Sequence, residues 1–155
     1  MHARTLCASV AVSLAAVCGF AQQPKPGAYE VTVVTTTISP SRGGGERQPR
    51  TLQACLTQDM IDKYGAIVPE RLTNACELVN VVKSPGGMTA EMVCSGPING
   101  KGTLAVTWSD SEHSKGNLHF SGTIHPGDTD IKLEWTATTT AVYKGPDCSA
   151  LKPTP

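Results

Sequence analysis

Hydrophobic and polar residues alternate with a period of two along most of this chain. In the first such stretch Tyr29, Val31 and Val33 alternate with Glu30 and Thr32, and Pro26-Gly27 forms a turn before them. A period of two is typical of a strand with one buried face. This stretch is therefore predicted to be a strand with Tyr29 on its buried side.

The middle of the chain mixes three patterns. Residues 39–50 show no periodicity and predict a loop, whereas Leu52, Ala54 and Leu56 mark a second strand. Thr57 can cap a short helix that ends at Gly65. Residues 77–83 and 88–94 predict a hairpin around the turn Ser84-Pro85-Gly86-Gly87.

Three further strands are predicted in the second half. Their apolar positions are Leu104, Val106 and Trp108, then Leu118, Phe120 and Ile124, and finally Ile131, Leu133, Trp135 and Ala137. Polar residues 109–117 and 125–129 are read as the turns between them. Short connections and one apolar face per strand indicate an antiparallel meander.

About seven strands of this kind must cover their apolar face. The expected fold is mainly β, a meander that curls into an open or closed barrel with the short helix at one opening. A two-layer α+β sheet is the alternative.

The N-terminal segment predicts export. Arg4 precedes an apolar run from Leu6 to Ala16, and Gly19-Phe20-Ala21 offers the small residues that signal peptidase recognises. The run is about half of the roughly 20 residues needed to span a bilayer. Residues 1–21 are therefore read as a cleaved signal peptide and 22–155 as a single β-rich domain, which places the protein in the periplasm or outside the cell.

Charge argues against two classes of partner. Removing residues 1–21 takes away Arg4, leaving 12 basic against 13 acidic residues in 134 positions. A chain so near neutrality has no electrostatic footprint for nucleic acid or for an anionic membrane surface. No later segment is apolar enough to span a membrane, so the protein is not expected to do so.

Four cysteines remain after Cys7 and Cys18 leave with the signal: Cys55, Cys76, Cys94 and Cys148. An even number in an exported chain predicts two disulfides. Zinc ligation would favour paired C-x-x-C spacing, which is absent from the sequence. No metal or other cofactor is expected.

Register within the predicted hairpin suggests the pairing. If Val82 opposes Met88, then Cys76 opposes Cys94, at the separation of about 4.5–5.5 Å that a disulfide tolerates. Cys55 would then pair with Cys148. A register one residue away would instead favour Cys55–Cys76 with Cys94–Cys148, or Cys55–Cys94 with Cys76–Cys148.

Several short motifs resemble one known family. They are Pro26-Gly27-Ala28-Tyr29-Glu30-Val31, Cys55-Leu56-Thr57-Gln58, Cys76, Met92-Val93-Cys94-Ser95-Gly96-Pro97 and Gly145-Pro146-Asp147-Cys148. Together they resemble a bacterial exported family known only as a domain of unknown function, over nearly all of residues 22–155. Here Tyr29 stands where that family usually has Trp, and Gln58 where it has Pro. The resemblance implies a β-rich envelope protein with four cysteines and carries no catalytic residues.

Candidate catalytic and metal-binding groups are sparse. His119 and His125 are six residues apart on a strand, roughly 20 Å at about 3.3 Å per residue, so they cannot share an ion, and His113 falls in a predicted turn. Ser121, His119 and Asp110 lack the nucleophile elbow of a serine hydrolase. Glu30 and Glu91 would serve a glycosidase only if folding brought them about 5 to 9.5 Å apart.

Two features suggest binding instead. Arg42, Arg47 and Arg50 in and beside the Gly-rich loop could reach an anionic group, although a solvated loop is the simpler interpretation. Threonine rows at 35–37 and 136–140 could form an ordered array, although threonine commonly decorates a sheet without further role. Residues 96–102 are Gly-rich but do not fit a phosphate-binding loop.

The sequence thus favours a non-catalytic binding module for an apolar or amphipathic envelope molecule such as a lipid. Four aromatic residues, Tyr29, Trp108, Phe120 and Trp135, are the candidates to line its ligand cavity. A structural or protein-interaction module without a small ligand is the alternative, and a hydrolase is a third hypothesis.

Overall fold

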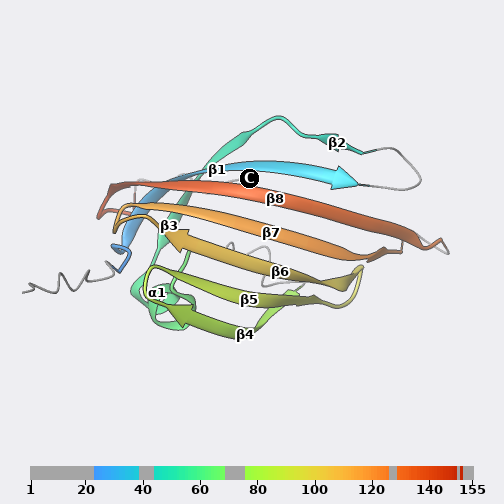
Figure 1. Ribbon diagram of the computed structural model, residues 1–155. Coiled ribbons are helices and arrows are strands. Elements are labelled where there is room, and N and C mark those ends of the chain that lie inside the picture. The colour runs from blue at the N-terminus through green and yellow to red at the C-terminus, as the bar shows by residue number, and fades with distance from the viewer. Residues whose placement is uncertain (1–22, 39–43, 69–75, 126–128, 150, 152–155) are drawn as a thin grey trace, which may run out of the picture.

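The structure, a computed structural model, describes residues 23–38, 44–68, 76–125, 129–149 and 151. The signal-peptide prediction for residues 1–21 and Arg42 lie outside these ranges. Within them the chain forms one antiparallel sheet of eight strands and one short helix (Figure 1). The mainly β prediction is confirmed.

The elements follow one another along the chain in this order: β1 (Gly27–Ile38), β2 (Gly45–Glu46), β3 (Arg50–Leu56), α1 (Gln58–Tyr64), β4 (Cys76–Ser84), β5 (Gly87–Cys94), β6 (Ile98–Trp108), β7 (His113–Ile124) and β8 (Ile131–Gly145). Strands β4 to β8 form the predicted meander, and β8 then pairs with β1. Both β2 and β3 pair with the other side of β1, at its two ends. The sheet is therefore open, with β4 at one edge and β2 and β3 at the other.

Three boundaries differ from the sequence-based prediction. The expected loop at 39–50 contains the two-residue strand β2. The expected turn at 109–117 is already strand from His113, because the inward residues there are Ser114 and Gly116, which give no hydrophobic signal. Strand β6 begins at Ile98 rather than near Leu104, because Gly100 and Gly102 occupy its inward positions.

Alternate residues of each strand form an inner face that carries the core. One cluster gathers Tyr29, Val31, Met88, Val106 and Trp108 with Leu56 and Ile61, and the second gathers Met92, Cys94, Leu118 and Phe120. In Figure 1, β3 crosses the sheet from β1 to α1, which lies at the ends of β4 and β5. Because Ile61 and Leu56 are buried against the sheet, this arm covers one end of the inner face.

The helix has both predicted caps. Thr57 accepts a hydrogen bond from the backbone N–H of Met60 at 3.2 Å, and Gly65 ends the helix in the left-handed conformation with φ 68°. The indole Nε1 of Trp108 donates to the carbonyl oxygen of Gly65 at 2.9 Å. The C-terminal cap thus ties the helix to β6 and satisfies the polar atom of a buried Trp.

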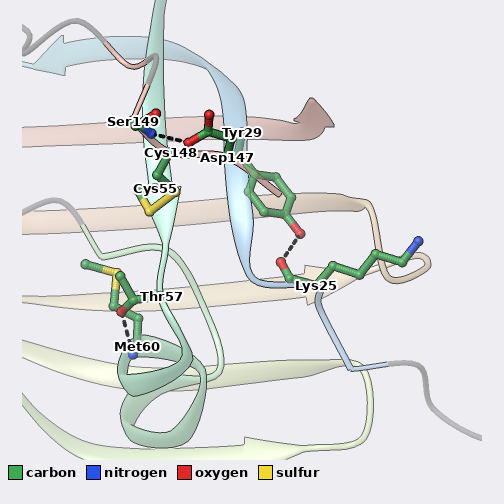
Figure 2. The surroundings of a disulfide bond; sticks show 8 residues. All are labelled: Lys25, Tyr29, Cys55, Thr57, Met60, Asp147, Cys148 and Ser149. Carbon is green, nitrogen blue, oxygen red and sulfur yellow. Dashed lines mark hydrogen bonds between the residues drawn. A yellow bond between two sulfur atoms is a disulfide. The ribbon is translucent and has the colours of Figure 1, made fainter. Parts of the chain in front are cut away.

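Tyr29 anchors the start of β1. Its side chain is fully buried, and its hydroxyl donates to the carbonyl oxygen of Lys25 at 2.8 Å (Figure 2). Its ring meets those of Trp108 and Tyr143 edge-on, with centroids 5.8 and 5.4 Å away. Burial raises the pKa of Tyr29 to about 12. The prediction that Tyr29 faces the core is confirmed.

Two disulfides close the structure, Cys76–Cys94 and Cys55–Cys148, the pairs that the predicted register favoured. Cys76 lies directly opposite Cys94 in the β4–β5 hairpin. Cys55 on β3 meets Cys148 just beyond β8 with Cα atoms 5.6 Å apart (Figure 2). One premise was wrong, because Lys83 rather than Val82 opposes Met88. A β-bulge between Val79 and Val82 compensates for that shift and restores the cysteine alignment.

Candidate functional site

A groove lies on the outer face of the sheet, opposite the core. Its volume is about 630 Å³, and it runs across the strands from β4 to β8. The side chains that line it from the outer face are Asn80, Val82, Thr89, Glu91, Thr103, Ala105, Asn117, His119, Thr136 and Thr138.

Strand register explains why these residues meet. Thr103 on β6 lies opposite His119 on β7, which lies opposite Thr136 on β8. The neighbouring row joins Ala105, Asn117 and Thr138 in the same way. Short side chains at outward positions on the central strands leave space above the backbone, so the groove floor follows from residue size.

The chemistry of the groove is mixed. Val82 at the β4 end is 61% exposed, and Ala105 and the threonine methyl groups add apolar surface. Glu91, Asn80, Asn117 and His119 supply polar groups, and His119 Nε2 lies 2.9 Å from Glu134 Oε1. Lys101 and Lys115 lie on the same face one residue pair beyond these rows. The groove floor thus combines apolar surface with the polar groups of Asn117 and His119, and the two lysines lie beyond it on the same face.

The four aromatic candidates lie on the other face of the sheet. Tyr29 and Trp108 belong to one core cluster, Phe120 is buried in the second, and Trp135 is half-buried against it. Trp135 and Phe120 have ring centroids 5.7 Å apart. These side chains contribute to the core, and a role in lining a ligand cavity stays a prediction.

Each histidine that could be a metal ligand pairs with its own carboxylate. His113 contacts Asp110 at 2.9 Å, His119 contacts Glu134 at 2.9 Å, and His125 contacts Asp130 at 2.5 Å. Hydrogen bonds from the backbone N–H of Glu112 and from His113 lower the pKa of Asp110. No cluster of three metal-ligating side chains occurs among the residues that the structure describes.

The candidate catalytic groups are not brought together. Asp110 lies before the first residue of β7 and holds His113, whereas His119 and Ser121 lie toward the other end of that strand. Glu30 on β1 pairs with Lys144 at 3.1 Å, and three strands separate it from Glu91 on β5. At about 4.8 Å per strand step, four steps exceed the separation that paired glycosidase carboxylates need.

The remaining binding candidates have separate placements. Arg47 and Arg50 are exposed at the β2 and β3 side of β1, away from the groove. Strands β1 and β8 bring the two threonine rows side by side, with Thr36 opposite Thr136 on the outer face. Thr35 and Thr37 lie opposite Ala137 and Trp135 on the inner face, so the rows form no single array. Residues 96–102 run from a turn into β6.

Sequence reasoning missed the groove because it followed the inward residues of each strand. The outward residues carry the signal: Thr103, Ala105, Asn117, Thr136 and Thr138 are all short, on three strands that the meander places side by side. An alignment of predicted strands by register could have found them.

Comparison with known proteins gives a family and no described activity. Neither the curated proteins nor the solved structures contain a match to this chain. In the part of the chain that the structure describes, no helix is both long and apolar enough to cross a membrane. The sequence model of one family matches residues 24–148, and the chain therefore belongs to the family described as protein of unknown function (DUF3617).

Proposed function

We propose that this protein is a non-catalytic binding module for an amphipathic envelope molecule, which lies in the groove on the outer face of the sheet. The observation that carries the proposal is the groove itself, about 630 Å³ in volume, within the range typical of small-molecule sites. Its length across five strands suits an extended chain better than a compact ligand.

The composition of the groove supports an amphipathic ligand. Exposed Val82 and the short floor around Ala105 would cover an apolar chain, whose burial stabilises the complex by roughly 25 cal/mol per Å² of apolar area. Glu91 on β5 and Asn117 and His119 on β7 would bind a polar head group. The groove lacks an aromatic side chain among its described lining residues, so the ring stacking that favours sugars is not offered there.

Location is consistent with this role. Two disulfides indicate an oxidising, exported environment. A cleaved signal peptide at residues 1–21 and a periplasmic or secreted location complete the proposal.

Titration with dodecylphosphocholine below its micelle concentration, followed by amide NMR shifts, tests the site. We expect saturable shifts at Ala105, Asn117 and Thr136 on the outer face. Shifts confined to Trp108 and Phe120 would place the ligand on the inner face and overturn the groove assignment. Absence of saturable shifts would overturn the proposal for this class of ligand.

An interaction module without a small ligand is the second candidate. It is favoured by β4, which pairs only with β5 among the described residues and so leaves one strand edge open. The bulge in β4 weighs against it, because a bulge disrupts the regular ladder that another chain would need. Size-exclusion chromatography with light scattering across a concentration series tests edge-to-edge self-association.

A further inference from the structure

The β4–β5 hairpin contains a mismatch in length between its two fixed points. The turn pairs Lys83 with Met88, and the disulfide pairs Cys76 with Cys94. Cys76 lies seven residues before Lys83, whereas Cys94 lies only six residues after Met88. One residue of β4 therefore has no partner on β5.

The extra residue is accommodated at Asn80. The register shifts between Val79 and Val82, and Asn80 takes φ 51°, the only positive φ of a non-glycine residue among those described. Asparagine tolerates this conformation better than most residues. The bulge lies between the turn and the disulfide, and both must hold for it to persist.

A regular ladder extended from the turn would give a different arrangement. It would pair Asn80 with Glu91, Val79 with Met92 and Glu77 with Cys94. Val79 would replace Leu78 on the inner face, one apolar side chain for another. Asn80 would return to an extended conformation and a paired position.

The slipped register also has costs, which oppose its gain in regular pairing. Leu78 would turn toward solvent, and Glu77 would turn inward beside Cys94. The Cys76 position is only half-buried, so the longer Glu77 side chain could extend to water from there. Because β4 is an edge strand among the described residues, sliding would break its pairing with β5 alone.

We propose that the Cys76–Cys94 disulfide selects the bulged register, and that its reduction by a dithiol lets residues 76–79 slide by one position along β5. In the exchange, a dithiol thiolate attacks the half-buried Cys76 sulfur and the S–S bond breaks. The second thiol of the reductant then displaces Cys76 from the mixed disulfide. The reductant leaves as a disulfide, and Cys76 and Cys94 retain the two hydrogens and two electrons. Since Asn80 and Val82 line the outer groove, the slide changes its wall.

NMR of the variant Cys76→Ser with Cys94→Ser, in which Cys55–Cys148 stays intact, tests the proposal. We expect the backbone contacts between Leu78 and Met92 to be replaced by contacts between Val79 and Met92, with loss of the positive φ at Asn80. Retention of the Leu78–Met92 contacts and of the bulge would overturn the proposal.

Deletion of Asn80 in the same serine background is the matched control. It removes the mismatch, because a regular ladder from the turn then places residues 76 and 94 opposite each other. We expect Leu78 to stay opposite Met92 in this variant, although the Cys76–Cys94 disulfide is absent. A register change in the deletion variant without the disulfide would contradict the mismatch as the cause.

A cross-linking variant decides the question if the double serine variant does not fold. In Cys76→Ser with Glu77→Cys, residue 77 faces Cys94 only in the slipped register. We expect peptide mapping to find a 77–94 disulfide and NMR to find Val79 opposite Met92. Free thiols at both positions in folded protein would overturn the proposal.

Discussion

Gly100 lies beneath the ring of Phe120, and a Cβ atom added to Gly100 would come within 2.7 Å of Phe120 Cζ. Gly122 on the neighbouring strand has the same relation to this ring, at 2.8 Å. The ring thus covers two glycines that leave no side chain of their own on the inner face. An aromatic ring over strand glycines supplies the packing that they lack.

Gly100→Ala should destabilise the protein by about 1–3 kcal/mol, because the added methyl group overpacks a closed site. It would also meet the backbone carbonyl oxygen of Ser121 at 2.4 Å, which cannot move as a side chain can. Gly45→Ala is the control, since nothing lies within 4 Å of the added atom there. Urea midpoints measure both variants, and equal midpoints would show that the Phe120 site has room.

These glycines also show where sequence reasoning succeeded and where it failed. Strands with large inward residues, such as the one from Tyr29 to Val33, were identified because alternation is strong there. The first part of β6 was missed because its inward residues are Gly100 and Gly102. The alternation signal depends on large apolar side chains at the inward positions. Backbone hydrogen bonds between strands form the sheet and do not depend on those side chains.

The disulfide pairing was predicted from register, yet the register premise contained an error of one residue. A bulge at Asn80 cancelled the error, and no periodicity argument places a bulge within Leu78-Val79-Asn80-Val81-Val82. The groove was missed for a related reason. It depends on the relative register of β6, β7 and β8, which pairing between distant segments determines.

Asn80→Val should destabilise the protein by roughly 1–2 kcal/mol, because the left-handed region costs most L-residues that much whereas asparagine tolerates it. A β-branched side chain is especially poorly suited to φ 51°. Asn80→Gly should be close to neutral because glycine adopts positive φ readily. Thermal or urea unfolding compares the two variants. If valine and glycine had the same effect, the backbone conformation at this position would not limit stability.

The two disulfides should contribute unequally. Cys55–Cys148 spans 93 residues and Cys76–Cys94 spans 18, so chain-entropy reasoning gives about 4.5 and about 3 kcal/mol. Paired serine variants of each bridge, unfolded in urea, should therefore lose stability in that order. The reverse order would mean that loop entropy does not dominate their contributions.

Tyr29 should make stability depend on pH in the alkaline range. Its pKa is about 12 in the folded protein because burial disfavours the phenolate, against about 10 in an unfolded chain. The stability that the buried, neutral Tyr29 contributes is complete below about pH 10 and is lost as pH rises toward 12. Tyr29→Phe removes this titration. The difference in free energy of unfolding between wild type and variant should therefore narrow from pH 9 to pH 11. A difference independent of pH would contradict the assigned burial effect.

Native mass spectrometry of protein purified from its own host tests whether a ligand binds in the outer groove. Two variants accompany wild type: Ala105→Trp, which fills the groove floor, and Thr140→Trp, on the same face outside the groove lining. We expect a copurifying amphipathic adduct on wild type and on Thr140→Trp, reduced at least tenfold on Ala105→Trp. An equal adduct on all three proteins, or no adduct on wild type in repeated preparations, would contradict binding in the groove.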